Sequence, residues 1–122
     1  MREKFYYNID QTEIAVLVTN TYGAGWSTWN SNPEIAWDPR VIKYWLSCDE
    51  EFNVMASRYD TPQQEELIAK MKEFGYEDLY CGGWKNLEIE WVPIGSVFRV
   101  REYDGAEGVE ILNLNEWEVA SR

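Results

Sequence analysis

The run EIAVLVT at residues 13–19 constrains the fold most, because it is apolar almost throughout and rich in β-branched residues. A run of this length and composition predicts a strand that is buried in a hydrophobic core. The stretch at 20–33 that follows is rich in Gly, Ser, Asn and Pro, which is typical of a long loop. The first expectation is therefore a buried strand that ends in an extended loop.

Helix signals follow the loop at residues 38–47. Asp38 is a good N-cap residue, and Pro39 suits the first position of a helix. Helical periodicity then predicts one apolar face formed by Val41, Ile42, Trp45 and Leu46. Residues 48–60 carry no decisive pattern, and the sequence leaves them unassigned.

A second helix is predicted at residues 61–75. Thr61 is a good N-cap, Pro62 suits the first turn, and Gln64 stands three residues after the cap, as in a capping box. Gly75 is suited to ending the helix. The expected buried stripe consists of Leu67, Ile68, Met71 and Phe74.

The second half of the chain predicts three strands at 87–93, 97–102 and 108–112. Turn sequences separate them at 93–96 and at Asp104-Gly105. Residues 1–122 are therefore expected to form a single α+β domain, in which an antiparallel β-meander is covered on one face by about two helices.

Charge and composition exclude several kinds of function. The net charge of −11 disfavours nucleic-acid binding, which needs a basic surface, and disfavours binding to anionic membranes. The chain contains no histidine, so it has no Ser-His or Cys-His nucleophile. Cys48 and Cys81 do not form a CxxC pair and are expected to be free thiols. Neither a metal nor a cofactor is expected. An acidic surface remains compatible with an inhibitor that docks on a basic partner, or simply with solubility.

The candidate site centres on the stretch YGAGWSTWN at 22–30. Its glycines allow close backbone approach, its N–H groups and hydroxyls suit an anion, and its tryptophans suit stacking on a flat ring. Two arginines on one predicted strand suit phosphate. These parts would fit a nucleotide-like ligand. The candidate residues are Tyr22, Gly23, Gly25, Trp26, Ser27, Thr28, Trp84, Arg99, Arg101, Tyr103 and Asp104.

Each candidate also has a purely structural interpretation. Trp26 and Trp84 are equally suited to the core, and Arg99 and Arg101 to the solvated face of a sheet. A further alternative is a small enzyme that uses carboxylates on a glycan or a nucleotide, with Asp104 and Glu107 as candidates. The purely structural interpretation of Asp104-Gly105 is a hairpin turn.

Three segments resemble a family of small uncharacterised phage and prophage proteins. They are YGAGWS at 22–27, DPRVI at 38–42, and IEWVPIGSVFRVREYDGAE at 89–107. In that family the loop resembles Tyr-Gly-Gly-Phe-Ser, whereas this chain has Ala24 between the glycines and Trp26 in place of phenylalanine. The family brings no established activity. The resemblance implies a phage or mobile-element accessory protein that acts in the cytoplasm of a bacterial host.

Small phage accessory proteins commonly act by stoichiometric binding, and this analogy guides the functional hypothesis. The chain is expected to counter a host defence system without catalysis. It would either sequester a nucleotide-like signal or block a host defence protein through its acidic surface. A homodimer is a further possibility, because the chain is rich in aromatic residues.

Overall fold

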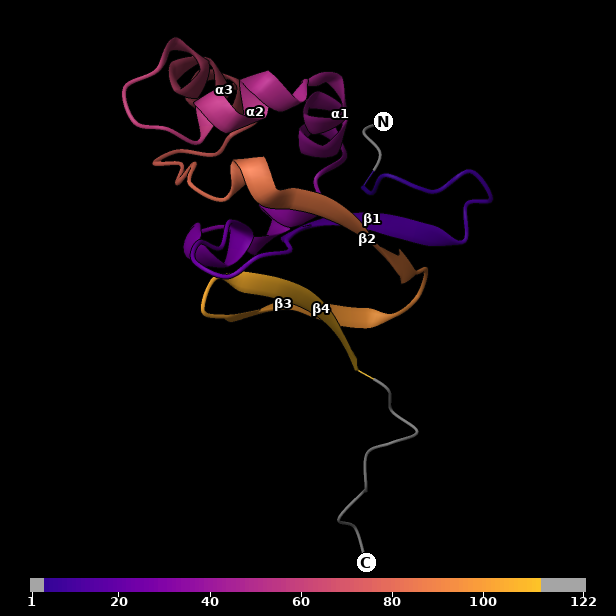
Figure 1. The fold of residues 1–122 in the computed structure, drawn as a ribbon. Coiled ribbons are helices and arrows are strands. Elements are labelled where there is room, and N and C mark those ends of the chain that lie inside the picture. The colour runs from indigo at the N-terminus through magenta and orange to yellow at the C-terminus, as the bar shows by residue number, and fades with distance from the viewer. Residues whose placement is uncertain (1–3, 113–122) are drawn as a thin grey trace, which may run out of the picture.

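A computed structural model describes residues 4–112 of the chain (Figure 1). The elements confirm the predicted α+β class. Their order is β1 (Glu13–Thr19), α1 (Pro39–Ser47), α2 (Glu50–Ala56), α3 (Pro62–Glu73), β2 (Leu87–Pro93), β3 (Val97–Tyr103) and β4 (Ala106–Leu112). Short 3₁₀ turns lie at Ser27–Trp29, Pro33–Ala36 and Trp84–Asn86.

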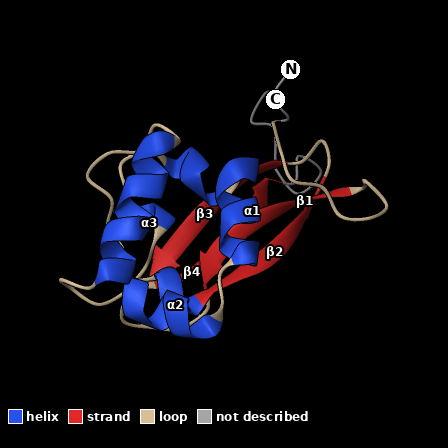
Figure 2. Ribbon diagram, turned by 90° about the horizontal axis from the view of Figure 1, so that it is seen from above, coloured by secondary structure: helices blue, strands red, loops and turns tan. Residues whose placement is uncertain are grey.

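The strands form two separate antiparallel pairs. β1 pairs with β2 over its full length, and β3 pairs with β4 as a hairpin. The expected continuous meander is therefore corrected at one point, because β2 and β3 follow each other in the chain without pairing. Figure 1 shows three layers, with the helices on one side of β1 and β2 and the hairpin on the other. Figure 2, seen from above, shows the helices covering the strands.

The burial of β1 explains this layered arrangement. Alternate residues of a strand point to opposite faces, so Ala15 and Leu17 pack against the helices. Val16 and its neighbours on the same face pack instead against the hairpin, where they contact Phe98 and Val100. A strand that is apolar on both faces needs cover on both, and a single sheet with helices on one side would leave one face in water.

The helix starts follow the caps found in the sequence. The Asp38 side chain accepts a hydrogen bond from the Arg40 N–H at the start of α1. The Thr61 hydroxyl accepts one from the Gln64 N–H at the start of α3. The unassigned stretch 48–60 contains α2, which begins after Asp49, whose carboxylate accepts from the Phe52 N–H. The sequence does not predict this helix, because seven residues are too few to show a clear helical periodicity of apolar residues.

For two residues of the predicted apolar faces, the expected burial was wrong. Leu46 and Ile68 were expected in the core, but their side chains are 49% and 38% exposed. α1 and α3 each bury a narrower stripe, which includes Val41 and Ile42 in α1 and Leu67 in α3. Ile68 therefore lies on the surface of α3 as a large apolar side chain.

Candidate functional site

Three segments that are distant in sequence meet at one end of the molecule, on the left of Figure 1. They are the loop at 20–30, the segment at 80–84 and the turn at 103–106. The Gly23 N–H donates to the Asp104 carbonyl over 2.6 Å. The Asn30 side chain binds both backbone groups of Tyr80, over 3.2 and 2.8 Å. We call this region the loop junction, and it contains most of the residues predicted to bind a ligand.

The hairpin turn between β3 and β4 packs against the backbone of the loop. Asp104 and Gly105 have positive φ angles of 50° and 90°, which suits a tight hairpin turn and confirms the structural interpretation of this pair. The Gly105 Cα lies against the loop, and a Cβ there would be 2.4 Å from the Ala24 nitrogen. The Thr19 hydroxyl also donates to the Gly105 carbonyl over 2.7 Å.

Glu107 is the central polar group of the loop junction. Its side chain is buried, and one carboxylate oxygen accepts a hydrogen bond from the Thr19 N–H over 3.0 Å. The other oxygen accepts from the Trp26 N–H, the Thr28 N–H and the Thr28 hydroxyl, over 2.9, 3.0 and 2.5 Å. A carboxylate with several N–H donors forms strong, charge-assisted hydrogen bonds. Glu107 therefore fastens the loop to the end of β1.

This arrangement corrects the predicted anion site. The sequence predicted that the N–H groups of Gly23 and Gly25 and the hydroxyls of Ser27 and Thr28 would face an anionic group. In the structure the Gly23 N–H donates to the Asp104 carbonyl, and the Thr28 hydroxyl donates to Glu107. Ser27 is buried as well. Gly25 allows the close approach of the chain's own Thr28 and Trp29 side chains, which lie 2.9 Å from the position of a Cβ. An internal carboxylate takes the place that was assigned to the ligand.

Two of the three tryptophans that were expected to offer stacking surfaces, Trp26 and Trp84, belong to the core, whereas Trp29 is partly exposed. Trp26 and Trp84 are both 0% exposed, and their rings pack edge to face with centroids 5.4 Å apart. Neither ring presents a face to solvent, so the prediction that they stack on a ligand is corrected. The physical reason is the size of the indole ring. Removing its large apolar surface from water stabilises the fold more than an exposed ring would. The Trp84 indole N–H donates to Asn53 over 2.6 Å, whereas the Trp26 indole N–H has no partner within residues 4–112.

This difference predicts unequal effects of two matched substitutions. Trp84→Phe removes a hydrogen bond and leaves the Asn53 oxygen unpaired, whereas Trp26→Phe removes a buried N–H that has no partner. We expect Trp84→Phe to cost about 2 kcal/mol more of the free energy of unfolding than Trp26→Phe. Urea denaturation of both variants measures this difference. Equal costs, or a larger cost for Trp26→Phe, would contradict the contacts described above.

The predicted phosphate-binding arginines lie away from the buried loop. Arg99 and Arg101 are on the outer face of β3, where both bind Glu110 of β4. Hydrogen bonds from Arg101 hold the pKa of Glu110 below its ordinary value. Because β3 side chains alternate, the loop contacts Glu102 on the inner face and not these arginines. The structure thus confirms that they lie on the wet face of the sheet and does not bring them to the glycines.

What the loop junction presents to solvent is a set of aromatic rings. Tyr22 and Tyr103 are each 72% exposed and pack edge to face, with centroids 6.3 Å apart. Trp29 is 44% exposed, packs on Tyr80 and donates its indole N–H to Glu102 over 3.2 Å. We call Tyr22, Trp29, Tyr80 and Tyr103 the aromatic end. Trp26 therefore points inward and Trp29 outward, from the same loop.

The two carboxylates proposed for an enzyme have different environments. Asp104 is exposed in the turn. Both oxygens of Glu107 are taken by hydrogen bonds to the loop and to Thr19. Glu107 is thus a structural residue, and the two side chains do not form a pair of free carboxylates.

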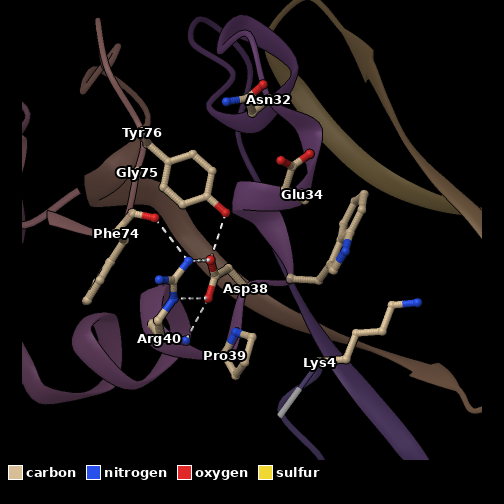
Figure 3. Close-up of a pocket in the computed structure, with 10 residues that line it drawn as sticks. Lys4, Asn32, Glu34, Asp38, Pro39, Arg40, Phe74, Gly75 and Tyr76 are labelled. Carbon is tan, nitrogen blue, oxygen red and sulfur yellow. Dashed lines mark hydrogen bonds and ion pairs between the residues drawn. The ribbon is translucent and has the colours of Figure 1, made fainter. Parts of the chain in front are cut away.

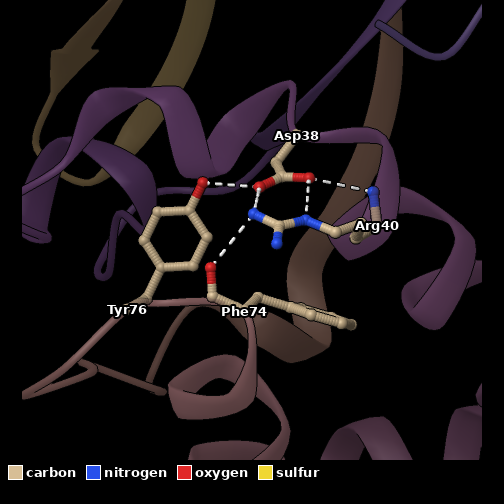
Figure 4. Close-up of polar contacts among 4 residues, drawn as sticks. All are labelled: Asp38, Arg40, Phe74 and Tyr76. Atoms are coloured by element: carbon tan, nitrogen blue, oxygen red, sulfur yellow. Dashed lines mark hydrogen bonds and ion pairs between the residues drawn. The ribbon is translucent and has the colours of Figure 1, made fainter. Parts of the chain in front are cut away.

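A separate pocket of about 420 Å³ lies between the start of α1 and the end of α3 (Figure 3). It was not predicted from the sequence. Asp38 and Arg40 form a bidentate ion pair in its wall, with distances of 3.1 and 2.7 Å, and the Tyr76 hydroxyl donates to Asp38 over 2.7 Å (Figure 4). Arg40 also donates to the Phe74 carbonyl over 3.0 Å. This network ties the two helices together.

Protonation states in the pocket follow from burial and from these contacts. Burial alone would raise the pKa of Asp38, but hydrogen bonds from Arg40 and Tyr76 outweigh it and hold the pKa below its ordinary value. Burial, followed by the hydrogen bond to Asp38, raises the pKa of Tyr76. Asp38 is therefore ionised and Tyr76 neutral at physiological pH.

The lowered pKa of Asp38 predicts a pH-dependent stability. A carboxyl group with a depressed folded-state pKa stabilises the fold above its unfolded pKa of about 4, and this contribution is lost as the pH falls through the folded value. We expect Asp38→Asn to cost about 1–2 kcal/mol at pH 7, because Arg40 is partly exposed and solvent weakens the pair. The difference from the parent should shrink below about pH 4. Denaturation curves at several pH values test this, with the exposed Glu34→Gln as control; parallel profiles would contradict it.

The two cysteines are free, as expected. Burial raises the pKa of Cys81 to about 11, so this thiol is protonated at neutral pH. Within residues 4–112, no three His, Cys, Asp or Glu side chains are grouped so as to hold a metal ion. No helix in the same range has the length and apolar character needed to cross a membrane.

Comparison of the chain with protein-family models, with curated proteins and with solved structures gives no match.

Proposed function

We propose that this chain is a non-catalytic binding protein that blocks a basic partner protein through its aromatic end. The observation that carries the proposal is the exposure of Tyr22 and Tyr103 at 72% each, beside the carboxylates of Glu102 and Asp104. Tyrosine and tryptophan dominate the energetics of protein interfaces. Carboxylates next to them favour a partner that carries lysine or arginine.

Hydrogen bonds that hold the residues of the aromatic end support the same function. Tyr22 lies next to Gly23, whose N–H binds the hairpin turn, and Trp29 is held by Glu102. A surface that is ordered before binding loses less conformational entropy on binding. The buried Glu107 thus stabilises the aromatic end, because it binds the loop that carries Tyr22 and Trp29.

The resemblance to phage and prophage proteins suggests the biological role. A phage accessory protein acting in the bacterial cytoplasm would meet host defence proteins there, including proteins with basic nucleic-acid-binding surfaces. The net charge of −11 supports association with such a target through long-range attraction. Capture of a nucleotide-like signal at the loop is the weaker version, since Glu107 and the core occupy the parts it needs.

Affinity capture from bacterial lysate, followed by measurement with the purified partner, tests the proposal. The double variant Tyr22→Ala/Tyr103→Ala should weaken binding at least about a hundredfold. The matched control is Ile94→Ala/Val97→Ala, which removes two exposed apolar side chains that lie away from the loop junction. Binding should also weaken as salt rises. Equal loss in both double variants, or no loss in either, would refute the assignment of the surface.

A further inference from the structure

A groove runs along α3, beside the segment that leads from its end to β2. One hollow of about 430 Å³ lies towards the C-terminus of α3, and a second of about 490 Å³ lies towards its N-terminus. Both are lined by Ile68, Asp78 and Leu79, so they lie next to each other along the helix. Figure 1 shows this segment leaving α3 and reaching β2 on the left of the molecule, where the loop junction lies.

One wall of the groove is a regular stripe of the helix. Gln64, Ile68 and Lys72 line it and are spaced four residues apart, so they lie on the same face of α3. Ile68 is the exposed apolar side chain that the sequence had assigned to the core. With Leu79 opposite, it forms an apolar centre that is accessible from solvent.

The other wall supplies acid groups, tyrosines and free backbone. Glu77 and Asp78 are exposed and form no ion pair within residues 4–112, and together they outweigh the single ammonium of Lys72. Tyr59 is 82% exposed and lines the N-terminal hollow together with Tyr80. In the same described range, the N–H groups of residues 77–79 donate to no protein acceptor.

We propose that this groove binds an extended peptide segment of the partner, with an apolar side chain on Ile68 and Leu79 and an arginine or lysine on Asp78. The apolar centre selects the first side chain. The carboxylates and the two tyrosine rings select a cation, which an aromatic face also attracts. The unpaired backbone groups can bind the main chain of an extended segment. The inference rests on the proposed function in one respect, namely that the partner is a basic protein.

Tyr80 connects this groove with the aromatic end. It lines the N-terminal hollow and packs on Trp29 with ring centroids 5.2 Å apart. A partner bound at the aromatic end can therefore extend a terminal or loop segment into the groove. Two linked contacts of this kind give a higher affinity than either contact alone.

A synthetic peptide tests the groove without the partner. The probe is acetyl-Gly-Ser-Arg-Leu-Ser-Arg-Gly amide, compared with one peptide that has Glu for Arg and another that has Ser for Leu. We expect saturable shifts of amide NMR signals confined to α3, to residues 57–59 and to residues 76–82, for the first peptide only. Asp78→Asn and Tyr59→Ala should each weaken binding about tenfold or more, and Ile68→Ser should do the same. The control variants Glu65→Gln and Glu73→Gln, on the same helix outside the groove, should bind as the parent does.

Each outcome has a defined meaning. Absence of saturable shifts, shifts outside the groove, or equal binding of the Glu peptide would overturn the groove assignment. Because Tyr59 is exposed, its variant keeps the test valid even if Ile68→Ser fails to fold. Loss of partner binding in Tyr22→Ala/Tyr103→Ala with no peptide binding would leave the proposed function standing and remove only the groove. If the peptide binds but the double variant leaves partner binding unchanged, the groove assignment stands and the proposed function is refuted.

Discussion

Glu107→Gln should destabilise the fold almost as much as Glu107→Ala, by about 3–5 kcal/mol. Three N–H groups and one hydroxyl converge on the two carboxylate oxygens. A glutamine side chain has only one oxygen, so its amide nitrogen must face either the Thr19 N–H or the N–H groups of Trp26 and Thr28. Two donors then oppose each other in a buried site, and at least one donor loses its partner.

Guanidinium denaturation measures this effect, and Glu110→Gln is the matched control. Glu110 lies three residues further along the same strand and binds Arg99 and Arg101 at the surface. Solvent screens such an exposed pair, so Glu110→Gln should change the stability far less than Glu107→Gln does. If Glu107→Gln were as stable as the parent, the loop would not depend on the carboxylate and the description of the loop junction would be wrong.

Gly105→Ala is expected to cost about 3 kcal/mol or more, because two independent effects combine. The φ angle of 90° is unfavourable for a residue with a Cβ. The added Cβ would also lie 2.4 Å from the Ala24 nitrogen, which is backbone and cannot rotate away. The turn and the loop would have to separate, which would break the hydrogen bond between Gly23 and Asp104.

Gly95→Ala separates the two effects. Gly95 lies in the turn between β2 and β3 with a similar φ of 86°, but a Cβ there would meet nothing within 4 Å. Only the conformational cost of about 1–2 kcal/mol should remain. Thermal unfolding of both variants gives the comparison. Equal losses of stability would mean that the contact between the turn and the loop contributes nothing.

Local features of the fold could be predicted from the sequence because their causes are local. The apolar run at 13–19 became β1 and the alternating run at 87–93 became β2, each with the predicted ends. The caps at Asp38 and Thr61 and the turn at Asp104-Gly105 were also located, since each depends on a few neighbouring residues. The pairing of β1 with β2 could not be predicted, because register is set by contacts between residues that are at least 68 positions apart (Thr19 and Leu87, 87 − 19).

The exposure of the candidate residues could be predicted from the sequence only in part. Tyr22, Tyr103 and Asp104 are at the surface of the loop junction, as a binding site requires. Trp26 and Trp84 are buried, because only the tertiary fold decides which side of a loop faces the core. The structural role of Glu107, which accepts hydrogen bonds from the loop, could not be predicted for the same reason. One acid among 22 carries no sign that it accepts hydrogen bonds from residues some 80 positions away.

The binding role of the aromatic end is tested most directly by the affinity of the captured partner for the Tyr22→Ala/Tyr103→Ala variant, measured by calorimetry beside the parent and the Ile94→Ala/Val97→Ala control. We expect the tyrosine variant to keep the unfolding temperature of the parent and to lose at least about a hundredfold in affinity, while the control loses less than about threefold. If the tyrosine variant binds as tightly as the parent, the aromatic end is not the binding surface.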